Sequence, residues 1–204
     1  MSKFSKMIGQ QFANPHGLIG RICCKIMNIF NQSMYKAVVR AIAADCTSTI
    51  LDVGYGNGYL LQMLYKKFSC KLCGVEVSTD VEQQAYKRNK KGIDGGKIQL
   101  IQADCCNLPF ESATFDAVTT VNTIYFWQDT EKGMSEIHRV LKDGGVFCNA
   151  VYSKKWLQKL SYTKDSFKFF DEQDYIDLGR KAGFAKVEIV DIKKNKNFLI
   201  VFTK

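Results

Sequence analysis

Between residues 45 and 151, short runs of apolar residues alternate with longer segments in which apolar residues recur every three or four positions. The short runs predict β-strands, and the longer segments predict amphipathic helices. The predicted strands are residues 49–53, 71–77, 97–102, 115–121 and 146–151, and the predicted helices are residues 59–68, 79–91 and 130–141. Nearly continuous apolar strands that alternate with helices are typical of a doubly wound parallel sheet with both faces covered.

After residue 151 the pattern changes to a helix and two strands. The helix is predicted over residues 171–182 and ends at Gly183, and two β-rich runs follow at residues 184–192 and 198–202. The basic turn between these runs, residues 193–196, is too short to hold a crossover helix, so the runs are expected to pair as an antiparallel hairpin. We therefore predict an α/β fold with a doubly wound, Rossmann-like, seven-stranded and mostly parallel sheet that ends in a C-terminal antiparallel hairpin.

The N-terminal segment is predicted to form a helical cap on this domain. Apolar residues at helical spacing, with basic residues between them, predict one amphipathic helix or two over residues 18–39. Packing on the chain's own domain is favoured over a place on a membrane surface. Residues 10–20, which include Pro15, are interpreted as a lid-like loop. The chain of 204 residues is expected to form a single domain.

Positive charge is concentrated in the two flanks of the chain. The formal net charge is +9, from 29 Lys and Arg against 20 Asp and Glu. Residues 1–40 hold six basic and no acidic residues (+6), residues 41–150 hold 11 and 13 (−2), and residues 151–204 hold 12 and seven (+5). Such an excess raises nucleic acid, an anionic membrane surface and an anionic small molecule as partners.

Targeting signals and metal-binding patterns are not evident in the chain. The N-terminus shows no continuous apolar signal-peptide segment, and no stretch approaches the roughly 18 apolar residues of a membrane span, so a cytoplasmic protein with reduced thiols is expected. The adjacent pairs Cys23–Cys24 and Cys105–Cys106 are expected to point apart, and Cys70 and Cys73 lie at the start of a strand. With only two histidines besides, no metal site is predicted.

A glycine-rich turn follows the first strand and opens a helix, where a parallel sheet presents its ligand site. Gly54, Gly56 and Gly58 follow Asp52 and give G-x-G-x-G, whereas the dinucleotide fingerprint would need Gly or Ala where Tyr59 stands. No Lys-Ser or Lys-Thr follows, which excludes a P-loop. The turn therefore indicates a nucleoside site that does not hold a pyrophosphate.

Three acidic residues close three successive predicted strands. Asp52 ends the first strand, Glu76 the second and Asp104 the third. Because the carboxyl ends of parallel strands meet at one edge, the three carboxylates are expected to lie together there. A carboxylate at the end of the second strand can accept hydrogen bonds from both hydroxyls of a ribose, and one after the third strand can accept from an adenine amino group.

The sequence resembles the class I S-adenosylmethionine-dependent methyltransferases, in particular the small group that methylates quinones and other small metabolites. The matching motifs occur in the family's order between about residues 50 and 151, and they are Leu51-Asp52-Val53-Gly54-Tyr55-Gly56-Asn57-Gly58, Gly74-Val75-Glu76, Asp104-Cys105 with Leu108-Pro109-Phe110, Phe115-Asp116-Ala117-Val118 and Arg139-Val140-Leu141-Lys142-Asp143-Gly144-Gly145. Tyr55 and Asp143 depart mildly from the family's usual residues.

The resemblance implies a site for S-adenosylmethionine, with residues 45–151 as the cofactor-binding half and residues 152–204 as the substrate-side half. It implies that Glu76 holds the ribose, and that Asp104 and the Cys105 amide hold the adenine. The amino acid end of the cofactor would meet Asp52. The other implied cofactor-binding residues are Gly54, Tyr55, Gly56 and Gly58 in the turn, Val121 and Asn122 after the fourth strand, and Gln11 and Phe12 in the lid.

Methyl transfer by in-line displacement depends chiefly on proximity and orientation, so no fixed catalytic set is required. His16 and Tyr125 are candidates for a general base. The candidate substrate residues are Tyr35, Tyr125, Trp127 and Trp156, because aromatic side chains suit an apolar or aromatic acceptor. A small-molecule acceptor, aromatic or anionic, is therefore expected, with no nucleic acid partner and no membrane span. A methyltransferase that acts on RNA or protein, and a noncatalytic S-adenosylmethionine-binding protein, are the alternatives.

Overall fold

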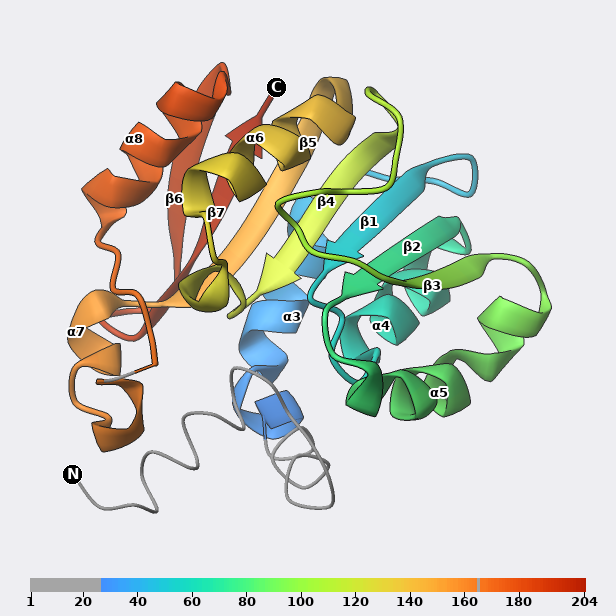
Figure 1. Cartoon of the computed structure of the whole chain (residues 1–204), viewed down its shortest axis with the longest axis horizontal. Helices are drawn as coiled ribbons and strands as arrows, with labels where there is room; N and C mark the ends of the chain where they lie inside the picture. Colours follow the sequence, from blue (N-terminus) through green and yellow to red (C-terminus); the bar gives the residue numbers. More distant parts are fainter. Residues whose placement is uncertain (1–26, 165) are drawn as a thin grey trace.

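The computed structural model describes residues 27–164 and 166–204 of the chain. One seven-stranded sheet forms its centre, in the order β3-β2-β1-β4-β5-β7-β6 (Figure 1). The strands are β1 (Thr49–Val53), β2 (Lys71–Glu76), β3 (Ile98–Gln102), β4 (Phe115–Val121), β5 (Leu141–Tyr152), β6 (Lys186–Lys193) and β7 (Asn197–Thr203). Neighbouring strands from β3 to β5 pair in parallel, whereas β7 runs antiparallel to both β5 and β6. The predicted fold class and C-terminal hairpin are confirmed.

Helices cover both faces of the sheet. The α-helices are α3 (Gln32–Ala41), α4 (Tyr59–Phe68), α5 (Glu82–Asp94), α6 (Thr130–Val140), α7 (Lys154–Leu157) and α8 (Glu172–Ala182), and the short 3-10 helices are η1 (Thr79–Val81), η2 (Ile124–Phe126) and η3 (Ser161–Thr163). Figure 1 shows α6 and α8 in front of the sheet and α3 behind it. Of the cap predicted within the first 44 residues, α3 is the helix described in full, and the helical residues 27–30 before it are separated from it by Asn31.

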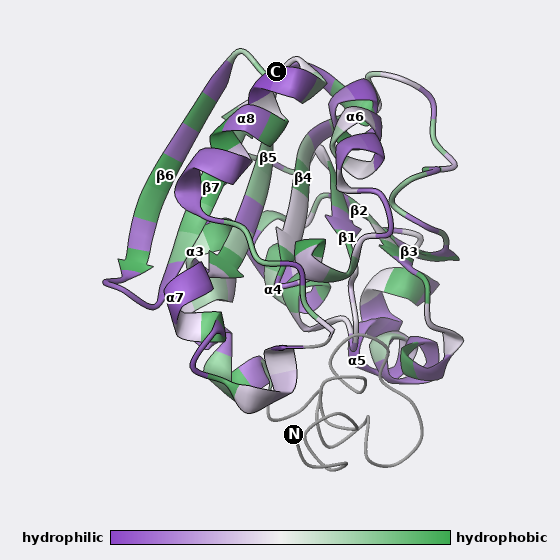
Figure 2. Cartoon of the chain, turned by 60° about the vertical axis from the view of Figure 1, so that its left-hand side comes forward, coloured by the Kyte–Doolittle hydropathy of each residue, from purple (hydrophilic) through white to green (hydrophobic). Residues whose placement is uncertain are grey.

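Alternation along the strands builds two hydrophobic cores. Leu51 and Phe147 face the core beneath α6 and α8, while the adjacent Ile50 and Cys148 face the core beneath α3, α4 and α5. Successive side chains of a strand point to opposite faces, so a continuous apolar run can supply both cores. The edge strand β6 instead alternates between charged and apolar residues, visible in Figure 2 as purple and green bands.

The fifth strand begins earlier than predicted. The sequence indicates a start at residue 146, after the turn at Asp143-Gly144-Gly145, but β5 already pairs with β4 at Leu141. The register shifts between Phe115 and Ala117, and Gly144 has a φ of 75°. A bulge therefore carries the chain through the glycine pair without ending the strand. The helices α7, η2 and η3 were not predicted, because segments of three or four residues are too short to show helical periodicity.

Candidate active site

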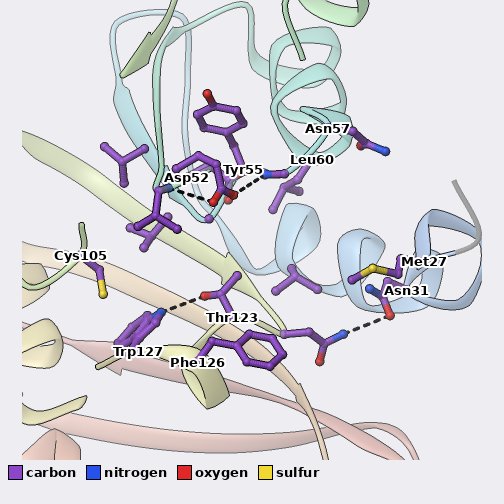
Figure 3. Close-up of a pocket in the computed structure, with 18 of the residues that line it drawn as sticks. Met27, Asn31, Asp52, Tyr55, Asn57, Leu60, Cys105, Thr123, Phe126 and Trp127 are labelled. Carbon is purple, nitrogen blue, oxygen red and sulfur yellow. Dashed lines mark hydrogen bonds between the residues drawn. The ribbon is translucent and has the colours of Figure 1, made fainter. Parts of the chain in front are cut away.

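A cavity of about 330 Å³ opens at the carboxyl ends of the parallel strands (Figure 3). Asp52 from β1, Glu76 from β2 and Asn122 after β4 all line it, as does the turn after β3. Figure 3 shows Asp52 and Tyr55 on one side, Phe126 and Trp127 on the opposite side, Cys105 at one end, and Met27 and Asn31 at the other. Its volume lies within the range of small-molecule sites.

The predicted glycine turn forms one wall of the cavity. Gly54, Gly56 and Gly58 have φ angles of 73°, 50° and 72°, in the left-handed region that favours glycine. A Cβ on Gly54 would lie 2.4 Å from Thr123 Cγ2, whereas a Cβ on Gly56 would meet no atom within 4 Å. Gly54 therefore allows two loops to pack closely, and Gly56 leaves its backbone open toward the cavity.

Gly58 supports the turn from behind and does not line the cavity. Its carbonyl accepts a hydrogen bond from Asn89 Nδ2 at 2.9 Å, and a Cβ here would lie 2.4 Å from that nitrogen. We expect Gly58→Ala to lower the free energy of unfolding by about 2–4 kcal/mol, because a left-handed φ and a buried clash add together. Chemical denaturation of both proteins measures this difference. Gly96→Ala is the control, since Gly96 has a φ of 67° but no neighbour within 4 Å; an equal loss in the control would contradict the packing argument.

Asp52 is a buried carboxylate at the end of β1. Its side chain is 2% exposed, and its Oδ1 accepts a hydrogen bond from Thr119 Oγ1 at 2.8 Å. Burial raises the pKa of Asp52 to about 7, and the nearby Glu76 adds to the rise. A carboxylate held in this way favours a positively charged group, which would offset the cost of its ionisation.

Glu76 joins the end of β2 to the glycine turn. Its Oε2 accepts from Gly56 N at 3.0 Å, and its Oε1 accepts from Val77 N at 2.9 Å and Ser78 N at 3.2 Å. Burial raises the pKa of Glu76, and these three N–H donors oppose the rise. The carboxylate is therefore fixed in orientation while it lines the cavity.

The turn after β3 supplies Asp104 and Cys105, and it differs from the prediction for the adjacent cysteines. Cys105 Sγ and Cys106 Sγ lie 4.0 Å apart, because the pair sits in a turn and not in a strand. With Asp104, they place three possible metal ligands within 4.8 Å of one another. Asp104 Oδ1 already accepts a hydrogen bond from Cys106 N at 2.8 Å, and Cys106 Sγ lies 3.2 Å from Asp129 O.

A polar network of asparagines and tyrosines links the cavity to the end of β5. Asn31 Oδ1 accepts from Asn122 Nδ2 at 3.0 Å and from Tyr152 Oη at 3.1 Å. Asn122 has a φ of 59°, which turns the chain sharply at the end of β4. Both asparagines line the cavity and are nearly buried. Asn57 also lines the cavity, and its buried Nδ2 has no hydrogen-bond partner among the described residues.

Tyr125 lies in the core and does not line the cavity, contrary to its prediction as a general base or substrate residue. The residue is 1% exposed. Its hydroxyl accepts from Tyr152 N at 2.6 Å and lies 3.1 Å from Tyr152 O. Burial raises the pKa of this hydroxyl well above its usual value. The pattern of apolar residues could not predict this, because η2 is too short to show a periodicity. Tyr125 points into the core, whereas Phe126 and the following Trp127 line the cavity.

We expect Tyr125→Phe to lower stability and to leave catalysis nearly intact. Loss of the hydroxyl leaves the buried N–H of Tyr152 without its acceptor, which costs about 1–3 kcal/mol of stability. Thermal unfolding and kcat, measured well below the transition, separate the two effects. Tyr86→Phe is the control, because the Tyr86 hydroxyl donates to Asp94 Oδ1 at 3.2 Å on the surface of the protein. A drop in kcat of about 100-fold or more with an unchanged melting temperature would restore Tyr125 as the base.

Most of the predicted site residues that the structure describes do line the cavity, and these are Tyr35, Asp52, Gly54, Tyr55, Gly56, Glu76, Asp104, Cys105, Val121, Asn122 and Trp127. Gly58, Tyr125 and Trp156 do not. The predicted residues Gln11, Phe12 and His16 lie outside the described part of the chain. The cavity also contains residues that the sequence did not single out, and these include Met27, Asn28, Asn31, Asn57, Thr123, Phe126 and Gln128.

Trp127 and Trp156 illustrate why only one of two predicted aromatic residues reaches the cavity. Trp127 is 5% exposed, and its Nε1 donates to Thr123 Oγ1 at 3.1 Å, which holds the ring against the cavity wall (Figure 3). Trp156 follows β5 in α7, where Lys196 Nζ lies 4.4 Å from its ring centroid. The second tryptophan thus belongs to a basic surface and not to the cavity.

Comparison with known proteins identifies relatives of the chain. The methyltransferase domain family matches residues 51–149. The chain is 32% identical over 144 residues to 2-methyl-6-phytyl-1,4-hydroquinone methyltransferase 1, chloroplastic, of Oryza sativa subsp. japonica, covering 69% of this chain and 42% of that protein. It is 30% identical over 166 residues to the uncharacterized methyltransferase YdaC of Bacillus subtilis, covering 80% of this chain and 86% of that protein.

The fold is also found in solved structures. A SAM-dependent methyltransferase from Aquifex aeolicus superimposes with a TM-score of 0.68 at 19% identity, covering 83% of this chain and 88% of that chain. The chain therefore spans less than half of the rice relative and most of the bacterial relatives.

Proposed function

Because this chain belongs to the class I S-adenosylmethionine-dependent methyltransferases, we propose that it transfers the methyl group of S-adenosylmethionine to a small, largely apolar acceptor. The observation that carries the proposal is the meeting of Asp52, Glu76 and the open backbone at Gly56 around one cavity. When bound, the cofactor supplies a methyl group already activated on a sulfonium. The protein's own part is to bind the cofactor and the acceptor, to orient them toward each other and to exclude water.

The cavity residues fit S-adenosylmethionine at each of its chemically distinct parts. Glu76 offers a fixed carboxylate for the ribose hydroxyls, and Asp104 with the Cys105 amide offers an acceptor and a donor for the adenine. The buried carboxylate of Asp52 and the backbone around Asn122 suit the amino acid end, which carries an ammonium group. These roles are proposals that rest on the placement of the residues and on the family.

The opposite wall of the cavity is suited to an apolar, aromatic acceptor. Phe126 and Trp127 bring aromatic rings to this wall, and Tyr35 and Met27 add a ring and a thioether elsewhere in the lining. The rice relative acts on a hydroquinone, as its name states, and a ring of that class matches such a wall. We therefore propose a hydroquinone or another electron-rich aromatic compound as the acceptor class.

We infer that the acceptor can supply much of its own nucleophilicity. Among the described residues that line the cavity there is no histidine, and Tyr125 is enclosed in the core. Electron-rich rings, thiols and amines can accept a methyl group without a strong base, because the cofactor carries an activated group. His16 stays a prediction as a general base, as do Gln11 and Phe12 as cover for the cofactor.

An acceptor screen tests the proposed function. The full chain is incubated with S-adenosylmethionine and one of several hydroquinones, phenols, thiols or amines, and S-adenosylhomocysteine release is measured. We expect release above background with hydroquinones or phenols, and a raised KM for the acceptor in Trp127→Ala. Phe169→Ala, outside the cavity, is the matched control. Release that needs RNA or protein, or that no small acceptor stimulates, would contradict the proposal.

Two further predictions from the sequence stay proposals. The first is the division of a single domain into residues 1–44, 45–151 and 152–204, although one sheet is built from the second and third of these segments. The second is a cytoplasmic location. It stays a proposal because the rice relative is named as a chloroplastic protein. No helix among the described residues has the length and apolar content to cross a membrane.

A further inference from the structure

We propose that a lysine-rich surface beside the cavity docks on an anionic lipid bilayer. This surface, called the lysine patch, is formed by the lysines of two segments that meet at Trp156, and these are Lys154, Lys155, Lys159, Lys164, Lys193, Lys194 and Lys196. It is formed by α7 with the segment that follows it and by the turn between β6 and β7. In Figure 2 the turn and the start of α7 lie side by side and are both purple, the colour of hydrophilic residues.

Hydrogen bonds and ring contacts hold the two halves of the patch together. Ser153 N donates to Lys196 O at 2.9 Å, and Ser153 Oγ lies 3.4 Å from Asn195 O. Lys196 Nζ is 4.4 Å and Lys159 Nζ is 5.9 Å from the ring centroid of Trp156. The two segments that carry these lysines therefore lie together, although they are about 30 to 40 residues apart in the sequence.

The positive charge of the patch is largely uncompensated. Lys154 pairs with Asp171 at 3.3 Å, but no other patch lysine forms an ion pair within the described residues. Lys155, Lys159, Lys164, Lys193 and Lys194 are exposed. Clusters of four to eight lysines at a surface are attracted to anionic lipid headgroups.

Apolar side chains lie at the same edge of the sheet as the patch. Ile29 is 76% exposed and Phe30 is 62% exposed. They directly precede Asn31, which bonds to Tyr152 at the end of β5, and α7 begins two residues after Tyr152. Two apolar side chains beside a cationic rim suit the boundary between headgroups and acyl chains.

Two features favour a bilayer over nucleic acid as the partner. All seven cations of the patch are lysines, which act as point charges, whereas arginine is the usual residue for forked contacts to nucleic acid phosphates and bases. In addition, Lys196 sits over the ring of Trp156, so this ring is not an open platform for stacking a base. Diffuse attraction to a charged lipid surface needs neither arginine forks nor an open aromatic ring.

The position of the patch also bears on the acceptor, and this step rests on the proposed function. The carboxyl ends of β4 and β5 lie at the same edge as the turn from Lys193 to Lys196. Docking through this edge would turn the cavity toward the bilayer. A lipid-soluble aromatic acceptor could then enter the cavity from the membrane without crossing water.

Vesicle flotation of the full chain tests the lysine patch without any turnover. We expect binding to vesicles of phosphatidylcholine mixed with phosphatidylglycerol at low salt, and release at high salt. Lys155→Glu, Lys193→Glu and Lys194→Glu together are expected to weaken this binding by more than about 100-fold, because each lysine near an anionic surface contributes roughly fivefold and each new carboxylate is repelled in addition. Lys66→Glu, Lys71→Glu and Lys91→Glu change the charge equally at the opposite edge and should bind nearly as the parent does.

Several outcomes would overturn the proposal. These are failure of the parent chain to float with anionic vesicles, equal binding to pure phosphatidylcholine, equal loss in the two triple variants, and tighter salt-sensitive binding to an oligonucleotide than to vesicles. Circular dichroism and thermal unfolding confirm that both variants are folded. Calorimetry with S-adenosylhomocysteine is run on the same preparations, so that failure of the lysine patch and failure of the proposed function are told apart.

Discussion

Replacing Glu76 with alanine is expected to weaken the binding of S-adenosylhomocysteine by about 1–3 kcal/mol, or roughly 5- to 150-fold in Kd. The change removes a charged acceptor for two ribose hydroxyls. It also removes the bonds that Gly56 N, Val77 N and Ser78 N donate to the carboxylate, so the turn loses part of its support. Calorimetric titration measures the change in affinity.

Two comparisons make the Glu76 result specific. Glu82→Ala removes the same charge from the exposed start of α5 and should bind the ligand as the parent does. Glu76→Gln should bind poorly despite its similar size, because its amide nitrogen would face Gly56 N, donor against donor. If Glu76→Ala binds S-adenosylhomocysteine with wild-type affinity, Glu76 does not hold the ribose.

Replacing Asp52 with asparagine is expected to make the ligand-free protein more stable at neutral and alkaline pH. The pKa of Asp52 is raised from 3.8 to about 7 in the folded chain by burial. The unfolded state therefore loses the proton near pH 4, while the folded state keeps it until about pH 7. Across this window the stability that the neutral carboxyl contributes is lost as pH rises, by up to about 4 kcal/mol.

Denaturation at several pH values, with asparagine as a neutral isostere, measures this loss. Near pH 4 the two proteins should respond alike to a further drop in pH, because both side chains are neutral when folded. As pH rises to about 8, Asp52→Asn should gain stability relative to the parent and then hold a constant advantage. A difference between the two proteins that does not vary with pH would contradict the raised pKa.

Asp52→Asn should also weaken the binding of the cofactor. If the ionised form of Asp52 receives the ammonium group, affinity for S-adenosylmethionine should fall by about tenfold from pH 8 to pH 6, following the ionised fraction around a pKa of about 7. Asp52→Asn should lose this pH dependence. The residue would thus trade stability for binding, as expected of a buried charge in a ligand site.

The sequence predicted which residues meet at the strand ends of the cavity, because their positions depend on where the strands end. Asp52, Glu76 and Asp104 each follow a recognisable apolar run, and parallel strands bring their carboxyl ends to one edge. Gly54 and Gly56 follow the first of these runs directly. Each position could therefore be placed without knowledge of any long-range contact.

The acceptor side could not be predicted in the same way. Asn31 reaches the cavity from the break before α3, and it meets Asn122 across 91 positions of sequence through a single hydrogen bond. Tyr125 and Trp127 are two residues apart in an irregular segment, yet one lies in the core and the other lines the cavity. No periodicity describes a 3-10 turn of three residues, so their directions follow from packing alone.

Calorimetric titration of the full chain with S-adenosylhomocysteine, and separately with NADH, tests the central claim most directly. The proposed ligand of the cavity is a nucleoside with an amino acid end, and the glycine turn lacks the dinucleotide spacing. We predict saturable binding of S-adenosylhomocysteine at one site and no measurable binding of NADH. Tight binding of NADH with no response to S-adenosylhomocysteine would contradict the account.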